Sequence, residues 1–294
     1  MSAAEGIRWP LRRRYLAPWM AAGGRRFAWG ERTYVMAIIN VTPDSFSGDG
    51  VGGDIGLAVE HALAFEAAGA DILDVGGESS RPGAKPVTPG EEAARVVPAV
   101  AAITRACSLP VSIDSYHASV AEAAIAAGAT MVNDISGLRF DSGMAAVVAR
   151  AEAPLIAMHN QRGRAFHDVI GDIRAGFDAT LCLCAQAGIA RERIILDPGF
   201  GFGWTERQNV EMVRRLPELW DYELPLLLGA SRKSTLGAIL GTTVNDRIEG
   251  SLAGAAMGIA AGVDIVRAHD VRETVRMVRV ADAVARDNWS SEGT

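Results

Sequence analysis

The sequence predicts an α/β fold, a (β/α)8 TIM barrel with an N-terminal β-hairpin extension. Eight short runs rich in Val, Ile or Leu do not alternate between apolar and polar residues, which is typical of strands buried on both faces of a parallel sheet. Alanine-rich helical stretches separate these runs, and several end in AGA, AGI or AGV, where a glycine can cap the helix. An open, doubly wound sheet is the alternative. The eight units and their even spacing favour the barrel.

The predicted strands and helices alternate along the chain. The strands are expected at residues 33–40, 70–78, 109–115, 130–136, 154–160, 193–199, 225–231 and 263–270. The helices are expected at residues 56–70, 91–106, 117–129, 144–153, 175–189, 209–220, 249–262 and 272–287. Because no Pro/Ser-rich linker interrupts the pattern, we expect residues 33–288 to form a single domain, followed by a flexible C-terminus at residues 289–294.

Residues 1–32 are expected to form an extension packed on the barrel. The segment RWPLRRRYLAPWMAAGGRRFAWGERTY has two short runs with aromatic residues on either side of a Gly-Gly turn, a pattern typical of a β-hairpin. The same segment is rich in Arg and poor in acidic residues, as transit peptides are. The aromatic residues and the turn favour the hairpin over a targeting segment.

The composition narrows the functional classes. A formal net charge of −6 argues against a general nucleic-acid binder. The chain has no run of 18 apolar residues, so we expect no membrane-spanning helix. The three cysteines, Cys107, Cys182 and Cys184, do not fit a disulfide framework and suit a reducing, cytoplasmic compartment. No His or Cys lies near them at ligand spacing, which argues against a zinc site.

Polar residues gather where the predicted strands end. In a (β/α)8 barrel the active site lies at the carboxyl ends of the strands, so these positions form a candidate site. They are Asn40, Asp74, Glu78, Asp114, Asn133, Asp134, Met158, His159, Asp197, Ser231, Lys233, Arg267 and His269. Strand ends can also be polar simply because loops are polar. The grouping of cations on the last two units, with acids on the middle ones, favours a ligand site.

Two basic motifs follow the seventh and eighth strands. GASRKSTLG offers Lys233 among small residues that let a ligand approach the backbone, and VRAHD contains Arg267 and His269. The loops after strands seven and eight are the usual phosphate-binding place of this fold. We therefore expect an anionic group here, and a basic cluster on the surface is the alternative.

Acidic and amide side chains end the middle strands. Asp114, Asn133 and Asp197 would form a ring of acceptors and amide groups in the barrel mouth. A buried carboxylate must be paired or hydrogen-bonded, and a flat heterocycle with adjacent N–H donors would satisfy it in two places at once. An internal salt bridge with Lys233 is the alternative, and the two interpretations can coexist.

Three loops complete the candidate site. In DPGFGFGWT, an exposed Phe202 would be costly without a partner, so it either covers an aromatic ligand or closes the top of the barrel. GGESSRPGAKPVTPGEE is a long loop whose charged tip, Arg81, suits closure over a substrate, although a plain surface loop is also possible. MAIINVTPDSFSGDG turns from apolar to polar at Asn40, which indicates a loop that holds a polar ligand.

Eight motifs together resemble the dihydropteroate synthases. NVTPDSFS, GGESSRPGA, SIDSYHA, NDISG, DPGFGFG, GASRKS, RIEGSLA and VRAHDV occur in the family's order between about Thr33 and Arg272. The resemblance implies a (β/α)8 barrel of folate biosynthesis that is usually homodimeric and is a target of sulfonamides. Such an enzyme joins 6-hydroxymethyl-7,8-dihydropterin diphosphate to 4-aminobenzoate and releases pyrophosphate, with Mg²⁺.

The resemblance also implies roles for individual residues. The implied pterin-binding set is Asp114, Asn133, Asp197 and Lys233, with Met158 and Gly229 lining the pocket. The implied diphosphate anchors are Arg267 and His269, and Asn40 would contact Mg²⁺ and the diphosphate. The implied aminobenzoate side is Ser80, Arg81, Pro82, Phe202 and Ser234. The implied catalytic residues are Asp114, Asp197, Lys233 and Arg267, which would stabilise the pterin cation and the departing charge.

Four positions depart from the usual motifs. Ser80 stands in place of Thr and keeps the hydroxyl, while in the first loop an Asp has moved by one position, to Asp49. The fifth strand's run has Asn160 where a second Met is usual, which predicts a more polar pocket wall. Trp204 replaces the usual Lys, which predicts an aromatic group at the site mouth and altered sulfonamide affinity.

Two other functions fit the same resemblance less well. A catalytically silent paralogue would keep the fold and the pterin pocket, but the intact GASRKS and VRAHDV motifs argue against it. A pterin-dependent methyltransferase on the same barrel would explain neither the basic cluster nor the SRPG loop.

Overall fold

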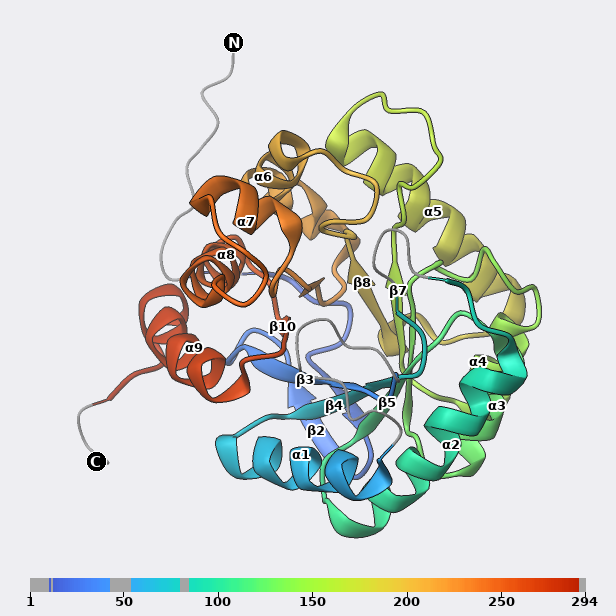
Figure 1. The fold of residues 1–294 in the computed structure, drawn as a ribbon. Coiled ribbons are helices and arrows are strands. Elements are labelled where there is room, and N and C mark those ends of the chain that lie inside the picture. The colour runs from blue at the N-terminus through green and yellow to red at the C-terminus, as the bar shows by residue number, and fades with distance from the viewer. Residues whose placement is uncertain (1–10, 12, 43–53, 80–84, 291–294) are drawn as a thin grey trace.

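The main sheet of the protein is a closed parallel barrel. The computed structural model describes residues 11, 13–42, 54–79 and 85–290. Its eight-stranded sheet has the order β8-β7-β6-β5-β4-β3-β10-β9. A parallel bridge between Leu196 and Leu226 joins the two edges of the sheet, and the helices surround it (Figure 1). The predicted (β/α)8 barrel is confirmed and the open sheet is excluded.

Each barrel strand lies within the residues where the sequence predicted it. The strands are β3 (Tyr34–Asn40), β4 (Ile72–Gly76), β5 (Val111–Asp114), β6 (Met131–Asp134), β7 (Leu155–Met158), β8 (Ile194–Asp197), β9 (Leu227–Leu228) and β10 (Ile265–Ala268). The helices are α1 (Ile55–Ala68), α2 (Pro89–Ala106), α3 (Ala118–Ala126), α4 (Met144–Ala151), α5 (Val169–Ala187), α6 (Glu206–Arg215), α7 (Ser234–Leu240), α8 (Ile248–Ala260) and α9 (Val271–Arg286).

The helices differ from the prediction in three places, each with a local cause. Helix α5 begins at Val169 rather than at residue 175, because the Asp168 carboxylate caps it by accepting from the Gly171 N–H at 2.8 Å. Helix α6 ends at Arg215, and a 3-10 turn that contains Pro217 continues the chain. Helix α7, which the sequence analysis did not count, begins directly after Lys233.

The N-terminal end of the barrel interior is apolar and sealed. Inward-facing side chains of the strands form one buried cluster: Tyr34, Met36, Ile72, Met131, Ile156, Ile195, Leu227 and Ile265. The predicted hairpin is present as β1 (Trp19–Ala22) and β2 (Arg25–Ala28), and its Met20 and Phe27 belong to the same cluster. The hairpin therefore closes the end of the barrel that lies opposite the strand carboxyl ends.

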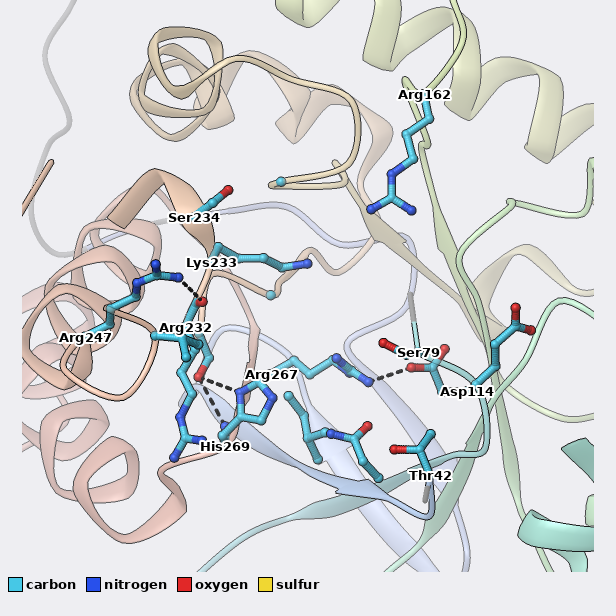
Figure 2. A pocket seen from close by; sticks show the side chains of 17 residues that line it. Thr42, Ser79, Asp114, Arg162, Arg232, Lys233, Ser234, Arg247, Arg267 and His269 are labelled. Atoms are coloured by element: carbon cyan, nitrogen blue, oxygen red, sulfur yellow. Dashed lines mark hydrogen bonds and ion pairs between the residues drawn. The ribbon is translucent and has the colours of Figure 1, made fainter. Parts of the chain in front are cut away.

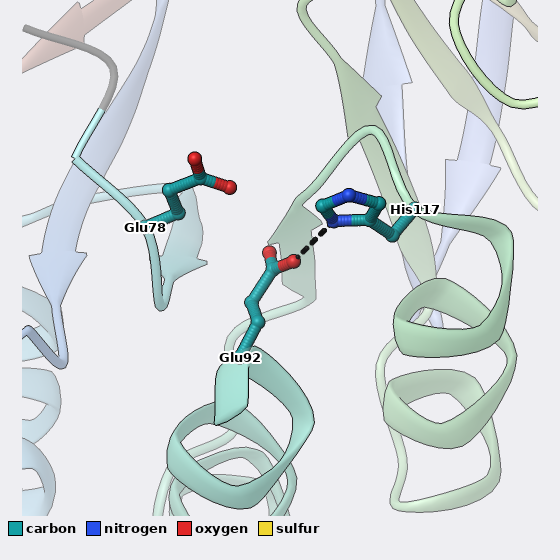
Figure 3. A group of neighbouring side chains, drawn as sticks. All are labelled: Glu78, Glu92 and His117. Atoms are coloured by element: carbon teal, nitrogen blue, oxygen red, sulfur yellow. Dashed lines mark hydrogen bonds and ion pairs between the residues drawn. The ribbon is translucent and has the colours of Figure 1, made fainter. Parts of the chain in front are cut away.

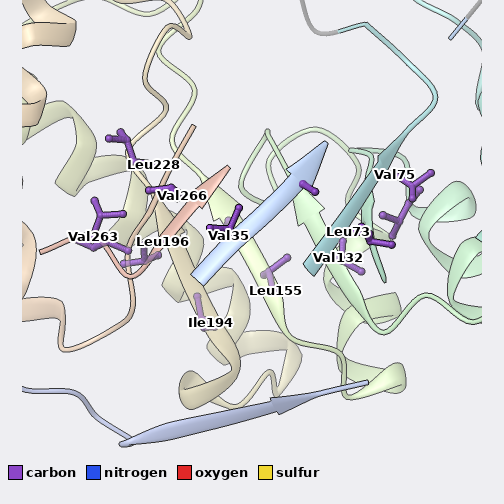
Figure 4. Close-up of a cluster of buried hydrophobic side chains, with 14 of the residues drawn as sticks. Val35, Leu73, Val75, Val132, Leu155, Ile194, Leu196, Leu228, Val263 and Val266 are labelled. Carbon is purple, nitrogen blue, oxygen red and sulfur yellow. The ribbon is translucent and has the colours of Figure 1, made fainter. Parts of the chain in front are cut away.

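The other face of the same strands packs against the helices. Val35, Leu73, Val132 and Leu155 belong to a second buried cluster, which lies outside the barrel interior (Figure 4). Because strands of a parallel sheet are covered on both faces, their residues are apolar at successive positions. This double burial explains the non-alternating runs in the sequence.

Buried carboxylates anchor the chain where it enters the barrel. Asp264, which precedes β10, accepts from Arg13 Nη1 and from the Tyr15 hydroxyl, each at 2.6 Å. Asp282 on α9 accepts from the backbone N–H of Thr33 at 2.6 Å and from its hydroxyl at 2.7 Å. These bonds tie the N-terminal segment and the start of β3 to the last strand and helix.

Within the described residues, no helix is both long and apolar enough to span a membrane. Cys107, Cys182 and Cys184 are all free, and Cys107 and Cys184 are buried. No disulfide therefore constrains the barrel, and its stability depends on packing and on the buried polar contacts.

Replacing Phe27 by Ala should destabilise the barrel through its sealed end. The ring is 1% exposed in the inner cluster, so its loss should lower the free energy of unfolding by about 3–5 kcal/mol. Trp19→Ala in the same hairpin is the matched control, because that ring is 46% exposed and should cost about 1 kcal/mol or less. Urea unfolding followed by circular dichroism measures both, and equal losses would contradict the sealing role.

Candidate active site

Side-chain alternation along the strands decides which strand-end residues enter the barrel. Asp74, Asn133 and Arg267 face inward, since they bond to one another across the barrel. Asp134, the next residue after Asn133, faces outward, and its carboxylate accepts from backbone N–H groups of the following loop at 2.7 and 2.8 Å. Of two adjacent polar residues at one strand end, only one therefore belongs to the site.

The strand ends open into a cavity of about 380 Å³ (Figure 2). Its lining is Ile38, Asn40, Thr42, Glu78, Ser79, Asp114, Arg162, Gly201, Gly229, Ser231, Arg232, Lys233, Ser234, Val244, Arg247, Arg267 and His269. Nine residues predicted from the sequence are in this lining: Asn40, Glu78, Asp114, Gly229, Ser231, Lys233, Ser234, Arg267 and His269. The other predicted residues that the structure describes are buried and are not in the lining: Asp74, Asn133, Asp134, Met158, His159, Asp197 and Phe202. Ser80, Arg81, Pro82 and Asp49 lie outside the described residues.

Arg267 joins two carboxylates at the floor of the cavity. Its Nε donates to Asp74 Oδ2 and its Nη2 donates to Asp114 Oδ2, both at 2.6 Å. Asn133 Nδ2 also donates to Asp74 Oδ2, at 2.9 Å. The internal salt bridge that the sequence analysis considered for Lys233 is thus formed by Arg267. The role of Asp74 at its centre was not predicted, although its place at a strand end was a signal.

Two buried oxygens beside this network have no hydrogen-bond partner among the described residues. They are Asp74 Oδ1 and Ser112 Oγ, and both residues are fully buried. Asp74 and Ser112 are register neighbours on β4 and β5. An unsatisfied buried carboxylate oxygen is costly, so the barrel floor retains capacity for further hydrogen bonds.

Burial shifts the pKa values of the charged groups around the cavity. It raises the pKa of Asp197 to about 6, although Lys233 and a bond from the Gly199 N–H oppose the rise. It lowers the pKa of Lys233 to about 8, with the Arg267 charge adding to the fall. It also raises the pKa of Asp114, against the attraction of the Arg267 guanidinium. Such shifts are typical of functional sites.

Phe202 is buried and lies against two cations. Its ring is 7% exposed, with Lys233 Nζ at 4.0 Å and the Arg162 guanidinium carbon at 4.7 Å from its centroid. The two cations and the burial give the ring the partners that the sequence analysis required, and its contact with an aromatic ligand stays a prediction. Arg162 itself was not predicted as a site residue, and its position just past the fifth strand was the available signal.

The loops after β7 and β8 are held against each other. The Gln161 N–H donates to the Phe202 carbonyl at 3.0 Å, and the His159 N–H donates to the Asp197 carbonyl at 2.9 Å. Gly203 has a φ of +86°, and a Cβ there would lie 2.4 Å from the Arg162 nitrogen. Only glycine permits this approach, which explains the alternating glycines of the FGFG segment.

Trp204 does not stand at the site mouth. Its side chain is 8% exposed and packs against His159, with the ring centroids 5.7 Å apart. It is also absent from the cavity lining. The prediction of an aromatic group at the mouth is wrong, because the chain turns this indole into the outer core. Its effect on sulfonamide affinity stays a prediction.

A basic wall follows strands β9 and β10. Ser231 Oγ lies 3.0 Å from His269 Nδ1 and accepts from the His269 backbone N–H at 3.2 Å. Arg232 has a φ of +57°, a strained value for a residue with a side chain, and its guanidinium pairs with Asp270 at 2.6 Å. Arg247 Nη1 donates to the Arg232 carbonyl at 3.0 Å. Arg232 and Arg247 were not predicted, although Arg247 begins the RIEGSLA motif.

A carboxylate–histidine group lies beside the cavity. Glu78, Glu92 and His117 each bring one potential ligand atom within 4.8 Å of the others (Figure 3). Glu92 Oε2 lies 2.7 Å from His117 Nδ1, and the Tyr116 hydroxyl donates to Glu78 at 2.8 Å. This arrangement could hold a divalent cation, and it already satisfies its own hydrogen bonds without one.

Comparisons with known proteins agree on one family. The family model described as "Pterin binding enzyme" matches residues 36–269. The dihydropteroate synthase of Clostridium beijerinckii is 45% identical over 268 residues, which is 91% of this chain and 100% of that protein. That of Escherichia coli is 40% identical over 264 residues, or 87% of this chain and 93% of the relative.

Solved structures place the fold in the same family. A dihydropteroate synthase from Clostridium difficile, determined in the presence of pteroic acid, has a TM-score of 0.83 and 45% identity, and covers 87% of this chain and 97% of its own. One from Xanthomonas albilineans, in complex with 7,8-dihydropteroate, has a TM-score of 0.82 and 36% identity over 90% and 98% of the two chains. With these matches and the cavity described above, the chain belongs to the pterin-binding enzymes, and among them to the dihydropteroate synthases.

Proposed function

We propose that the chain joins 6-hydroxymethyl-7,8-dihydropterin diphosphate to 4-aminobenzoate, forming 7,8-dihydropteroate and pyrophosphate in folate biosynthesis. One observation carries the proposal: a single cavity brings together the acid Asp114 and the cations Lys233 and Arg267 at the carboxyl ends of the barrel strands. Structures of the Xanthomonas albilineans relative with 4-aminobenzoic acid and with 7,8-dihydropteroate support the substrate class.

The acids and the amide are proposed to bind the pterin. A carboxylate can accept two parallel N–H bonds from the edge of a flat aminopyrimidine ring. The described contact of Asp197 uses only Oδ1, at 2.8 Å from the Gly199 nitrogen, which leaves Oδ2 to accept from a ligand. Asn133 and Asp114 would complete the edge, and Met158 and Gly229 would lie against the ring.

The basic wall, together with Arg267 of the cavity floor, is proposed to bind the diphosphate. Arg267 and His269 would hold the leaving group, with Ser231 orienting the His269 ring. The C–O bond to the diphosphate breaks and its electron pair leaves with pyrophosphate. The resulting cation at the exocyclic methylene is delocalised into the pterin and stabilised by the nearby carboxylates. The amine of aminobenzoate then forms the C–N bond and loses a proton.

Mg²⁺ is proposed as the cofactor, with Asn40 as its protein ligand. The residues present fit this ion, because Mg²⁺ takes few protein ligands and completes its shell with substrate phosphates and water. Asn40 lines the cavity at the end of β3 and offers an amide oxygen. Bound with the diphosphate, the ion would neutralise charge that develops on the leaving oxygen.

The second substrate is proposed to lie on the Phe202 side of the cavity. Ser234 lines the cavity and directly follows Lys233, which contacts the Phe202 ring. A position beside Lys233 would hold the amine close to the pterin methylene and exclude water from the cation. Ser80, Arg81 and Pro82 are proposed to contribute from the loop after β4, outside the described residues.

A catalytically silent pterin-binding paralogue is the alternative. Such a paralogue would need only the acidic residues and the Asn133 amide at the cavity floor. The cations Arg267 and Lys233, with the His269 imidazole beside them in the cavity, favour an enzyme that handles a diphosphate. A pterin-dependent methyltransferase is disfavoured for the same reason.

A cytoplasmic location is also proposed. All three cysteines are free, and two of them are buried where no second thiol pairs with them. Free thiols persist in reducing compartments.

The purified protein should convert the two substrates when Mg²⁺ is present. Pyrophosphate and dihydropteroate should appear together, and EDTA should abolish both until Mg²⁺ is restored. Lys233→Ala and Asp197→Asn should each lower kcat/KM by roughly 10²-fold or more, since each removes a charge from a water-excluded site. Arg150→Ala, an exposed residue on α4, is the control. Pterin binding without pyrophosphate release in the unaltered protein would favour the silent paralogue.

The pH profile of kcat/KM should be bell-shaped. The Asp197 carboxylate, whose pKa burial raises to about 6, should be lost by protonation as the pH falls through that value. The Lys233 ammonium, whose pKa burial lowers to about 8, should be lost as the pH rises through that value. In Lys233→Arg the alkaline limb should move upward, because a guanidinium stays protonated. An unmoved alkaline limb in that variant would assign it to another group.

A homodimer is proposed through the outer face of α7, α8 and α9. The three helices lie side by side, and Ile239, Met257, Val280 and Val284 on them are 61–67% exposed. An apolar patch of this kind is typical of an interaction surface. Val280 and Val284 lie one helical turn apart on α9, so they can act together.

The double variant Val280→Asp, Val284→Asp should be monomeric and folded. Association would bury the two introduced carboxylates, which opposes dimer formation. In the separate chains the same carboxylates remain hydrated. Light scattering after gel filtration measures the mass, with Leu63→Asp on α1, itself 43% exposed, as the control. A monomeric unaltered protein would refute the dimer, and a dimeric double variant would place its interface elsewhere.

A further inference from the structure

We propose that Arg247 and Ser251 of the RIEGSLA motif hold a strained turn of the GASRKS motif, and through that turn place Ser231 and Lys233 in the site. These two residues, which we name the clamp residues, act through the turn and are therefore positioning residues. The inference rests on the proposed function and gives a role to a motif that the proposed reaction leaves without one. The turn precedes α7 and the clamp residues lie at the start of α8, and the two helices pack against each other.

Residues 230–233 form a tight turn with an unusual backbone. The Lys233 N–H donates to the Ala230 carbonyl at 3.3 Å, which closes the turn. Arg232, the third residue of the turn, has a φ of +57°, whereas Ser231 does not have a positive φ. This combination is typical of a type II turn, whose third position normally holds Gly or Asn. A residue with a long side chain is strained there, and it favours the type I turn, whose central peptide group points the opposite way.

Ser251 fixes the central peptide group of this turn. Its hydroxyl donates to the Arg247 carbonyl at 2.8 Å and accepts from the Arg232 N–H at 3.0 Å. That N–H belongs to the peptide group whose direction distinguishes the two turn types, so the bond selects the type II turn. Ser251 is buried, and loss of its hydroxyl would leave the Arg232 N–H without this partner.

Arg247 holds the other end of the strained residue. Its Nη1 donates to the Arg232 carbonyl at 3.0 Å (Figure 2). The guanidinium crosses α7 directly over Gly237, where an added Cβ would lie 2.3 Å from Arg247 Nε. Only glycine leaves room for this path of the side chain. Arg232 is therefore bonded to the start of α8 through both its N–H and its carbonyl.

The turn separates two parts of the site. On one side of Arg232, Ser231 Oγ lies 3.0 Å from His269 Nδ1. On the other side, Lys233 Nζ lies 4.0 Å from the centroid of the Phe202 ring, and burial lowers the pKa of this lysine to about 8. Because both residues flank Arg232, a change of turn type would move one relative to the other. The clamp residues therefore set the position of Lys233 relative to the diphosphate side of the site.

A set of substitutions at Arg232 tests the clamp. Ser251 does not line the cavity, so Ser251→Ala removes the clamp hydroxyl and no cavity-lining side chain. It should lower kcat/KM about tenfold, the effect of an unsatisfied buried N–H. In an Arg232→Gly background the left-handed backbone is not strained, so the same substitution should lower kcat/KM by about twofold or less. In an Arg232→Ala background, which loses the same side chain but keeps the strain, the loss should again be about tenfold.

Equal losses in the Arg232→Gly and Arg232→Ala backgrounds would overturn the proposal, as would an unchanged kcat/KM in Ser251→Ala. Arg247→Ala should follow Ser251→Ala in all three backgrounds. A raised KM for the dihydropterin diphosphate that persists in the Arg232→Gly background would instead make Arg247 a substrate contact, and would overturn its place in the clamp.

Thr180→Ala is the matched control. The Thr180 hydroxyl is buried and donates at 2.9 Å to the carbonyl of Gly137, which also has a positive φ, and neither residue lines the cavity. This variant loses the same kind of bond at another loop, so its kcat/KM should stay within about twofold. A tenfold loss in Thr180→Ala would show that any buried hydroxyl has this effect, and would overturn the special role of the clamp.

A titration without substrates separates the clamp from the proposed function. The chain contains two lysines, Lys233 and the exposed Lys85, so NMR after reductive methylation with an isotope label can follow each amine. Ser251→Ala should raise the pKa of Lys233, because a released ammonium is less buried, and adding Arg232→Gly should restore the value of Arg232→Gly alone. Lys85 is the internal control.

If the unaltered protein makes no dihydropteroate, the proposed function fails while this titration still tests the clamp. A pKa of Lys233 that is the same in Ser251→Ala and in the unaltered protein would overturn the clamp, whatever the activity.

Discussion

Closure of the parallel sheet is the constraint on which the rest of the structure depends. Side chains alternate between the barrel interior and the helix layer, so each strand contributes only every second residue to the interior. The interior has an apolar end, which contains Met36 and Phe27, and a polar end, which contains Asp74 and Asp114. The N-terminal hairpin seals the apolar end, and the polar end can open only into the cavity. The charged side chains at the floor are therefore largely removed from water.

Arg267 organises that floor at a cost to stability. A guanidinium and two carboxylates removed from water gain little net stability, even with contacts of 2.6 Å. Asp74 Oδ1 also stays without a partner among the described residues. Buried polar groups that are satisfied only in part are expected at functional sites rather than in structural cores. The arrangement holds Asp114 in place before any substrate binds.

Glycine and aromatic residues shape the side of the site that is formed by the loops after β7 and β8. Gly203 lets the loop after β8 touch the loop after β7, and Phe202 then lies beneath Lys233 and Arg162. Two cations on one ring place positive charge beside the loop after β8. Neither loop alone would fix the position of its charged side chain. The contact between the loops fixes both positions, so the site has a defined charge distribution.

The sequence by itself determined the barrel and the polar strand ends. Buried parallel strands must be apolar at successive positions, and strand carboxyl ends in a barrel must meet, so runs such as 194–197 and residues such as Asp197 could be identified from local pattern. Tertiary structure alone decided which partner each charge has. Arg267 and Asp74 lie 193 positions apart, and Arg162 reaches the cavity only because two loops pack together. Such contacts depend on distances across the closed barrel, which no local pattern of residues contains.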